Sequence, residues 1–321
     1  MKKIILIFCI VVSFIFAISS CKKDKPTLQN ESPFPLNQGF IIYHSYSSYD
    51  AGDSKLFMYN FSNNIKTELS ANWNIEQVMN AHISPDGLKI VFMGYNSGLT
   101  EDWDVYIWNI GSTSHPTNLT NCNNIRDEDP KFSPDGNSII FKQEGDIKVM
   151  NLSGNIINTL TNDEYTIEES MPYFTKDGQK VIYARDDREK SDIYMMNING
   201  TGITSLYSEV GVSEYYPIIK DSSSFFYSRW ISSSIDNDQI YLGDFSGNTR
   251  SLSINDIHSD NSDAYPVNSD YLFFSSNRSG GFGGYDIYLG KISTGEVWNL
   301  NNFGVNSSKE ELGVCYFSSS N

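Results

Sequence analysis

The sequence predicts an all-β protein, a six-bladed β-propeller of four-stranded antiparallel blades. One strand signature recurs along the chain, beginning at Lys55, Asp104, Asp146, Asp192, Gln239 and Asp286. The successive intervals are 49, 42, 46, 47 and 47 residues. A period of about 40 to 50 residues with several short strands is typical of propeller blades. No segment after the N-terminal region shows helical periodicity, which also favours an all-β fold.

Hairpin turns define the first half of each repeat. Asp-Gly pairs at residues 86–87, 135–136 and 177–178 each stand between two short apolar runs. Glycine tolerates positive φ and aspartate bonds to its own turn, so these pairs indicate tight hairpins. We expect second strands at 89–93, 138–141, 180–183, 225–227 and 271–274, and last strands such as 117–120 and 156–161.

The two ends of the chain complete one blade. The first repeat has candidates for its second, third and fourth strands at 40–43, 56–59 and 66–69, but none for its innermost strand. Residues 312–317 form a further apolar run with no repeat after it. We expect this C-terminal strand to complete blade one and close the ring, which removes the exposed edges that would template aggregation.

The N-terminus has the layout of a secretory signal. Lys2 and Lys3 precede an apolar run at 4–16 and small residues at 17–20, directly before Cys21. A cysteine at this point resembles a bacterial lipoprotein signal, with Cys21 as the lipid-attachment residue; an ordinary secretory signal is the alternative. We expect a signal peptide at 1–20, a flexible tether at 21–38 and the propeller at 39–321, in an outer-membrane lipoprotein that faces either the periplasm or the cell exterior.

Composition limits the partners. The chain has 23 basic and 39 acidic residues, a net charge of −16, which repels nucleic acid and argues against such a partner. Besides Cys9 in the signal and Cys21, the cysteines are Cys122 and Cys315. Two thiols are too few for a disulfide framework. Whether they pair stays open, and we expect a monomer.

The repeats carry a family resemblance. Ser-Pro-Asp-Gly, then a strand, then Asp-Ile-Tyr-x-Met-Asn resembles the TolB-type, WD-like propeller repeat of bacterial envelope proteins. Residues 273–288 are similar to repeats found beside peptidoglycan-binding domains in Bacteroidetes-type envelope proteins. The resemblance covers 39–321. It implies a six-bladed propeller that binds something at its central face, without fixing the ligand.

A periodic set of acids is the strongest candidate site. Four repeats have a landmark proline before the Asp-Gly turn or its degenerate form, at Pro130, Pro172, Pro217 and Pro266. Three residues before these prolines stand Asp127, Glu169, Glu214 and Asp263, and Glu310 joins them if Gly313 takes the proline position. Carboxylates in one ring at the channel mouth would favour a divalent cation or a basic partner segment. The alternative is that each acid hydrogen-bonds its own loop or is simply solvated at the blade junction. His82, on an expected inner strand, could also approach the axis.

These observations favour a binding protein over an enzyme. We expect a non-enzymatic, lipid-anchored envelope propeller that binds a protein or polysaccharide partner at its central face. No catalytic residue is assigned, and no cofactor is expected apart from a divalent cation at the ring. The alternatives are a carbohydrate-active lyase or hydrolase with a metal at the channel mouth, which would use His82 and the acids, and a structural subunit of an envelope assembly.

Overall fold

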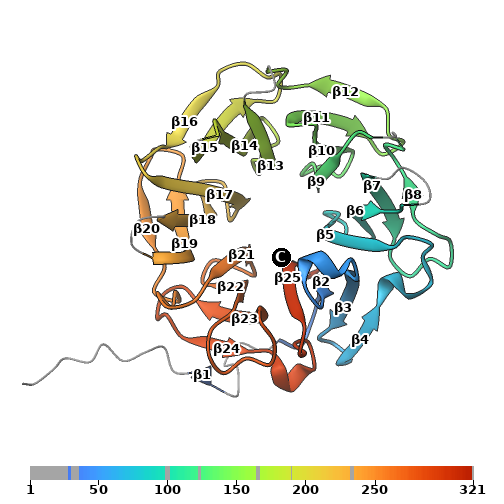
Figure 1. The fold of residues 1–321 in the computed structure, drawn as a ribbon, viewed down its shortest axis with the longest axis vertical. Helices are drawn as coiled ribbons and strands as arrows, with labels where there is room; N and C mark the ends of the chain where they lie inside the picture. The colour runs from blue at the N-terminus through green and yellow to red at the C-terminus, as the bar shows by residue number, and fades with distance from the viewer. Residues whose placement is uncertain are drawn as a thin grey trace, which may run out of the picture.

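The computed structural model confirms the six-bladed propeller (Figure 1). It describes residues 28–29, 36–97, 102–121, 124–163, 167–188, 190–231 and 235–319. Six antiparallel four-stranded sheets surround a central axis, and one of them gains a further strand. In the described part of the chain, helical structure is confined to three short 3₁₀ turns, at Tyr49–Ala51, Leu69–Asn72 and Asn301–Phe303.

The blades follow one another along the chain, and each is given from its inner to its outer strand. Blade one is β25 (Glu310–Phe317), β2 (Phe40–Tyr46), β3 (Lys55–Asn60) and β4 (Ile65–Glu68). Blade two is β5 (Gln77–Ile83), β6 (Lys89–Tyr95), β7 (Trp103–Asn109) and β8 (Thr117–Asn118). Blade three is β9 (Asp127–Phe132), β10 (Ser138–Gln143), β11 (Asp146–Asn151) and β12 (Ile156–Thr159).

The remaining three blades repeat this order. Blade four is β13 (Glu168–Phe174), β14 (Lys180–Asp186), β15 (Ser191–Asn197) and β16 (Thr204–Tyr207). Blade five is β17 (Val212–Ile219), β18 (Ser224–Ile231), β19 (Ile235–Asp244) and β20 (Thr249–Ser251). Blade six is β21 (Asn261–Pro266), β22 (Tyr271–Ser276), β23 (Asp286–Lys291) and β24 (Val297–Asn299).

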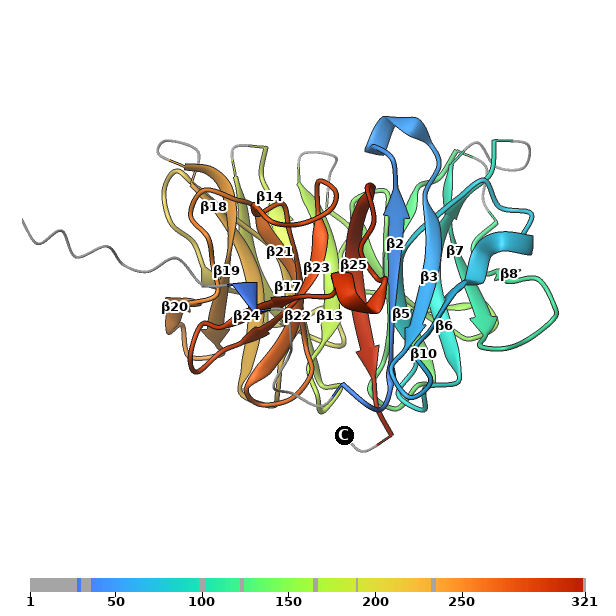
Figure 2. The same cartoon turned by 90° about the horizontal axis from the view of Figure 1, so that it is seen from below.

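The C-terminal strand closes the ring, as predicted. β25 pairs antiparallel with β2, with Phe40 opposite Phe317 and Ile42 opposite Cys315. Figure 2 shows β25 and β2 side by side, with the C-terminus at one face of the disc. We call this face the C-terminal face and the opposite one, where the inner strands begin, the funnel face. Large apolar clusters then fill the junctions between neighbouring blades, among them the one that joins blades six and one.

The N-terminal segment touches the outside of the ring. Within the expected tether, β1 (Leu28–Gln29) pairs in parallel with β24 as a fifth strand of blade six, with Leu28 opposite Val297. The expected signal peptide and Cys21 lie outside the described residues, so the domain division stays a prediction. Among the residues that are described, no helix is long and apolar enough to cross a membrane.

The Asp-Gly turns have the expected chemistry. The hydroxyl groups of Ser84, Ser133 and Thr175 donate to the aspartates two residues later, at 2.5, 2.6 and 2.7 Å. The glycines that follow have φ of 72°, 72° and 68°, which an L side chain adopts only with strain. Asp104, at the start of a recurring strand, likewise fixes its neighbourhood by accepting hydrogen bonds from Asn118 and Thr120.

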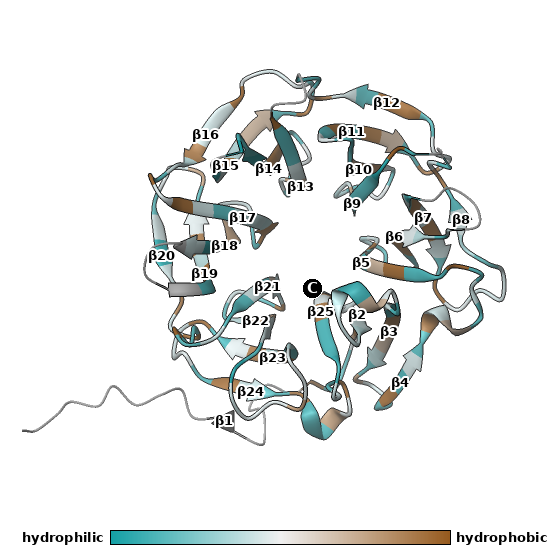
Figure 3. Ribbon diagram, in the orientation of Figure 1, coloured by the Kyte–Doolittle hydropathy of each residue, from teal (hydrophilic) through white to brown (hydrophobic). Residues whose placement is uncertain are grey.

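Every inner strand contains a β-bulge at an equivalent position. Each register shift coincides with one residue of positive φ. In chain order these residues are Asn80, Asp129, Met171, Tyr216, Asp263 and Gly313, with φ between 52° and 62°. A bulge re-aims side chains locally, so this position decides what the inner strands present to the axis. Figure 3 shows hydrophilic stretches on the inner strands β9 and β25.

Candidate functional site: the central channel

Three hollows lie in series along the axis. A funnel of ≈ 940 Å³ opens at the funnel face. Below it is a neck of ≈ 50 Å³, and a mouth of ≈ 310 Å³ opens at the C-terminal face. Funnel and neck share the bulge residues Asn80, Asp129, Met171, Tyr216 and Asp263. Neck and mouth share His82, Tyr173 and Tyr265. The bulges therefore form the floor of the funnel, and the second group separates neck from mouth.

The funnel is acidic. Its lining includes six carboxylates, from Glu128, Asp129, Glu144, Glu168, Asp186 and Asp263, against three cationic side chains, from Arg126, Lys142 and Arg188. The excess of three negative charges sits in a concave site, where low-dielectric walls focus the field. The wall can therefore attract a cationic group from solution.

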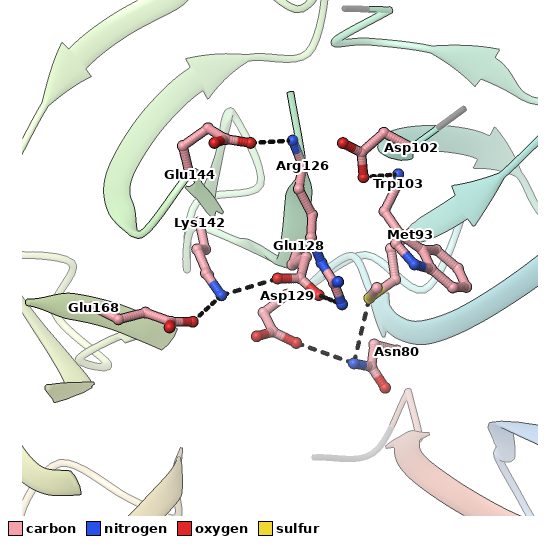
Figure 4. Close-up of polar contacts among 10 residues, drawn as sticks. All are labelled: Asn80, Met93, Asp102, Trp103, Arg126, Glu128, Asp129, Lys142, Glu144 and Glu168. Atoms are coloured by element: carbon pink, nitrogen blue, oxygen red, sulfur yellow. Dashed lines mark hydrogen bonds and ion pairs between the residues drawn. The ribbon is translucent and has the colours of Figure 1, made fainter. Parts of the chain in front are cut away.

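Two of the cations are already engaged by acids (Figure 4). Arg126 Nη2 lies 2.6 Å from Glu128 Oε1, and Lys142 Nζ lies 2.9 Å from Glu128 Oε2. Lys142 also pairs with Glu168 across the gap to blade four. Because these two cations and two acids neutralise one another, the acidic excess comes from the other acids of the lining, Asp129, Glu144, Asp186 and Asp263.

Asp129 and Asp263 are the acids of the funnel floor. Asn80 Nδ2 donates to Asp129 Oδ1 at 3.0 Å, and the Gly313 N–H donates to Asp263 Oδ2 at 3.1 Å. Burial raises the pKa of both carboxyl groups, to about 6 for Asp263. The neighbouring Lys131 opposes this rise. Both acids therefore lie where a bound cation would favour their ionised form.

The structure does not bring the predicted acids together as one ring at the channel mouth. Asp127, Glu169 and Glu214 are at most 2% exposed and do not line the funnel. Their partners are second-strand side chains of the same blade, namely Gln143 Nε2 on Asp127 at 2.8 Å, Arg185 Nε on Glu169 at 3.2 Å and Arg229 Nε near Glu214 at 3.6 Å. These acids belong to the blade interior, where their partners lie on a neighbouring strand rather than in a loop.

The sequence register explains why Asp263 and Glu310 differ from these three. Asp263 has a positive φ, as Asp129 has. Asp263 is therefore the blade-six counterpart of Asp129, and Asn261 is the blade-six counterpart of Asp127. Pro266 is therefore not equivalent to the other landmark prolines. In blade one, the bulge residue is Gly313, so Glu311 is the counterpart of Asp127. Glu311 is fully buried. Glu310 instead accepts a hydrogen bond from the Tyr285 N–H at 2.6 Å.

His82 does reach the axis, as expected, but in a hydrogen-bonded setting. The Phe132 N–H donates to His82 Nδ1 at 3.1 Å, so the ring proton is on Nε2, which lies 2.9 Å from the Tyr173 hydroxyl. Burial holds the pKa of His82 well below its usual range. In the described part of the chain, no group of three or more His, Cys, Asp or Glu could hold a metal ion. The divalent cation stays a prediction.

The second thiol also faces the channel. Cys315 is a buried free cysteine whose side chain lines the neck. Burial raises its pKa to about 12, which keeps it a neutral thiol. Cys122 lies outside the described residues, so the question of pairing is not answered.

Comparison with known proteins adds the family. A model of the TolB beta propeller domain matches residues 75–225. Residues 75–225 therefore carry TolB-type propeller repeats. The TolB of Acinetobacter baumannii superposes with a TM-score of 0.66 at 18% identity, over 87% of this chain and 66% of that one. The chain therefore spans just under two thirds of the length of that TolB. Comparison with curated protein sequences finds no significant match.

Other structures show how widely the fold is used. Hydrazine synthase of Kuenenia stuttgartiensis has a TM-score of 0.68 at 12% identity, over 88% of this chain and 47% of that one. A chain of the Nidogen/Laminin complex has a TM-score of 0.60 at 8% identity, over 87% and 98%. At these identities the likeness concerns the fold alone, so the function of the TolB-type propeller has to be argued from its own site.

Apart from Asp263, sequence reasoning missed the residues that line the funnel. Arg126, Glu128 and Lys142 carry no repeat signature, and the bulge position reads Asn, Asp, Met, Tyr, Asp and Gly in successive blades. One signal was available, because each landmark proline of blades three to five directly follows the bulge residue. The residue directly before the landmark proline lines the channel, whereas the residue three positions before it does not.

Proposed function

We propose that the protein is a non-enzymatic, lipid-anchored propeller of the bacterial envelope, and that its funnel binds a basic polypeptide segment of an envelope partner. The observation that supports this most is the funnel lining, with six carboxylates against three cationic side chains in ≈ 940 Å³. The TolB-type repeats in residues 75–225 support an envelope role. Lipid attachment at Cys21 rests on the sequence.

A lysine or arginine side chain fits the funnel floor. Asp129 and Asp263 both line the floor, each held by one hydrogen bond from Asn80 or Gly313. Because burial raises their pKa values, an approaching cation stabilises their ionised form and gains affinity from it. A protein segment is favoured over a neutral polysaccharide, which would gain nothing from this charge.

Calorimetry with a basic peptide tests the proposal. The purified protein is titrated with an acetylated decapeptide of alternating lysine and serine, and with the same peptide carrying glutamate for lysine. We expect saturable binding of the lysine peptide alone, weakening strongly between about 50 and 500 mM salt as the exposed charges are screened. The double variant Asp129→Asn with Asp263→Asn should bind at least about tenfold more weakly, a loss of about 1.4 kcal/mol.

A matched acid provides the control. Asp177 lies in an Asp-Gly turn of blade four, is exposed, and does not line the funnel, so Asp177→Asn should leave the affinity unchanged. The proposal fails if the lysine peptide shows no saturable binding. It also fails if the double variant, shown to be folded by circular dichroism, binds as tightly as the unmodified protein.

A further inference from the structure

The mouth at the C-terminal face differs in chemistry from the funnel. Its ≈ 310 Å³ lie within the size range of small-molecule pockets, about 300–1,000 Å³. Apolar and aromatic side chains form most of its wall: Pro85, Phe132, Pro134, Phe174, Tyr316 and Phe317. Such walls accept a flat or aliphatic body and exclude water from it.

Three polar side chains form the inner end of this mouth. His82 Nε2–H donates to the Tyr173 hydroxyl at 2.9 Å, and Tyr265 lines the same hollow. The group holds three hydrogens, one on the imidazole and one on each hydroxyl, and the bond to Tyr173 uses the imidazole hydrogen. A tyrosine hydroxyl hydrogen can therefore donate outside the group.

The charge around the mouth is positive. Among the residues that line it, Lys176 is the charged side chain, and none is aspartate or glutamate. Lys131 lines the neck directly behind the His82–Tyr173–Tyr265 group. The turn acids of this face, such as Asp86 and Asp135, bind the hydroxyl groups of their own turns. The chain as a whole has a net charge of −16. The mouth differs from it, because it offers hydrogen-bond donors and positive charge.

We propose that the mouth binds a carboxylate ligand with an aromatic or aliphatic body. The body lies between the rings of the wall, and the carboxylate accepts the free tyrosine hydroxyl hydrogen and pairs with Lys176. The carboxylate comes either from the C-terminus of an apolar polypeptide or from a small organic acid. This site is on the face opposite the funnel and shares no lining residue with it, so it stands or falls independently of the proposed function.

Matched acids and amides test the site. Nuclear magnetic resonance titration of the purified protein uses phenylacetate against phenylacetamide, and N-acetyl-diphenylalanine with a free carboxylate against its C-terminal amide. We expect at least one of the two acids to bind saturably, and its amide to bind at least tenfold more weakly. Binding of the peptide acid alone identifies a polypeptide C-terminus as the source, and binding of phenylacetate identifies a small acid.

Variants assign the binding to these residues. The double variant Tyr173→Phe with Tyr265→Phe removes both hydroxyl hydrogens but keeps the rings, and Lys176→Ala removes the charge at the rim. Each should weaken the acid at least fivefold and leave the weaker amide unchanged. Lys180→Ala, on the exposed start of β14, is the matched control. The proposal is overturned if neither acid binds, if acid and amide bind equally, or if folded variants bind the acid as the unmodified protein does.

Discussion

Buried carboxyl groups inside the blades tie the stability of this propeller to pH. Burial raises the pKa of Asp127, Glu169 and Glu214 to about 7 in each case. Their folded-state pKa values thus exceed the unfolded ones, so the stabilisation they contribute is full below about pH 4 and is lost as pH rises through about 7. The turn acids Asp86 and Asp135 act in the opposite sense, because hydrogen bonds from their turns lower their pKa.

Asp127→Asn should therefore stabilise the protein more at pH 8 than at pH 5. The amide keeps an acceptor for Gln143 Nε2 but cannot ionise. We expect a gain on the order of 1–3 kcal/mol at pH 8, or a rise in melting temperature of roughly 2–6 °C. Thermal unfolding at both pH values measures it, with the exposed Glu68→Gln as control. The same change in melting temperature at pH 5 and pH 8 would contradict the role assigned to Asp127.

At the scale of elements, the closing strand depends on a turn of the neighbouring blade. The Asp-Gly turn between β5 and β6 packs on the end of β25: a Cβ built on Gly87 would stand 2.4 Å from Phe317 Cε1. Phe317 in turn contacts Phe40 on β2, with ring centroids 5.6 Å apart. This turn of blade two therefore supports the pairing that completes blade one.

Gly87→Ala should destabilise the protein more than Gly111→Ala. Both glycines have positive φ, 72° and 81°, so both variants lose about 1 kcal/mol to backbone strain. Only Gly87 would also press on Phe317, because nothing lies within 4 Å of a Cβ at Gly111. We expect Gly87→Ala to cost about 1–3 kcal/mol more in denaturant unfolding. Equal losses, or no interaction energy in a double-mutant cycle with Phe317→Ala, would count against this packing.

For the whole molecule, local signals predicted the scaffold but not the channel wall. The period, the Asp-Gly turns and the unpaired ends are properties of short segments, so blade number and closure could be derived from them. The lining of the funnel depends on bulges, which interrupt the period-two alternation of each inner strand. Asp263 and His82 reach the axis as expected, whereas Asp127 lies two residues before a bulge and is turned into the blade.

The position of β1 bears on how the molecule is held. Leu28 pairs with blade six, and Cys21 precedes it by 28 − 21 = 7 residues. At no more than about 3.6 Å per residue, a lipid on Cys21 would keep blade six within about 25 Å of the bilayer. We expect Cys21→Ser to move the protein from the membrane to the soluble fraction, with Cys122→Ser as control. Retention of the Cys21→Ser protein in membranes would argue against acylation there.

The small neck has a consequence for the molecule as a whole. At ≈ 50 Å³, it has room for a few water molecules and none for a polypeptide, and His82, Tyr173 and Tyr265 line both its lower end and the mouth. The narrow neck thus separates the funnel from the mouth, and a polypeptide cannot pass through the ring. A ligand in the funnel does not exclude a ligand in the mouth. A single ring can therefore hold two different molecules at a spacing fixed by the thickness of its blades.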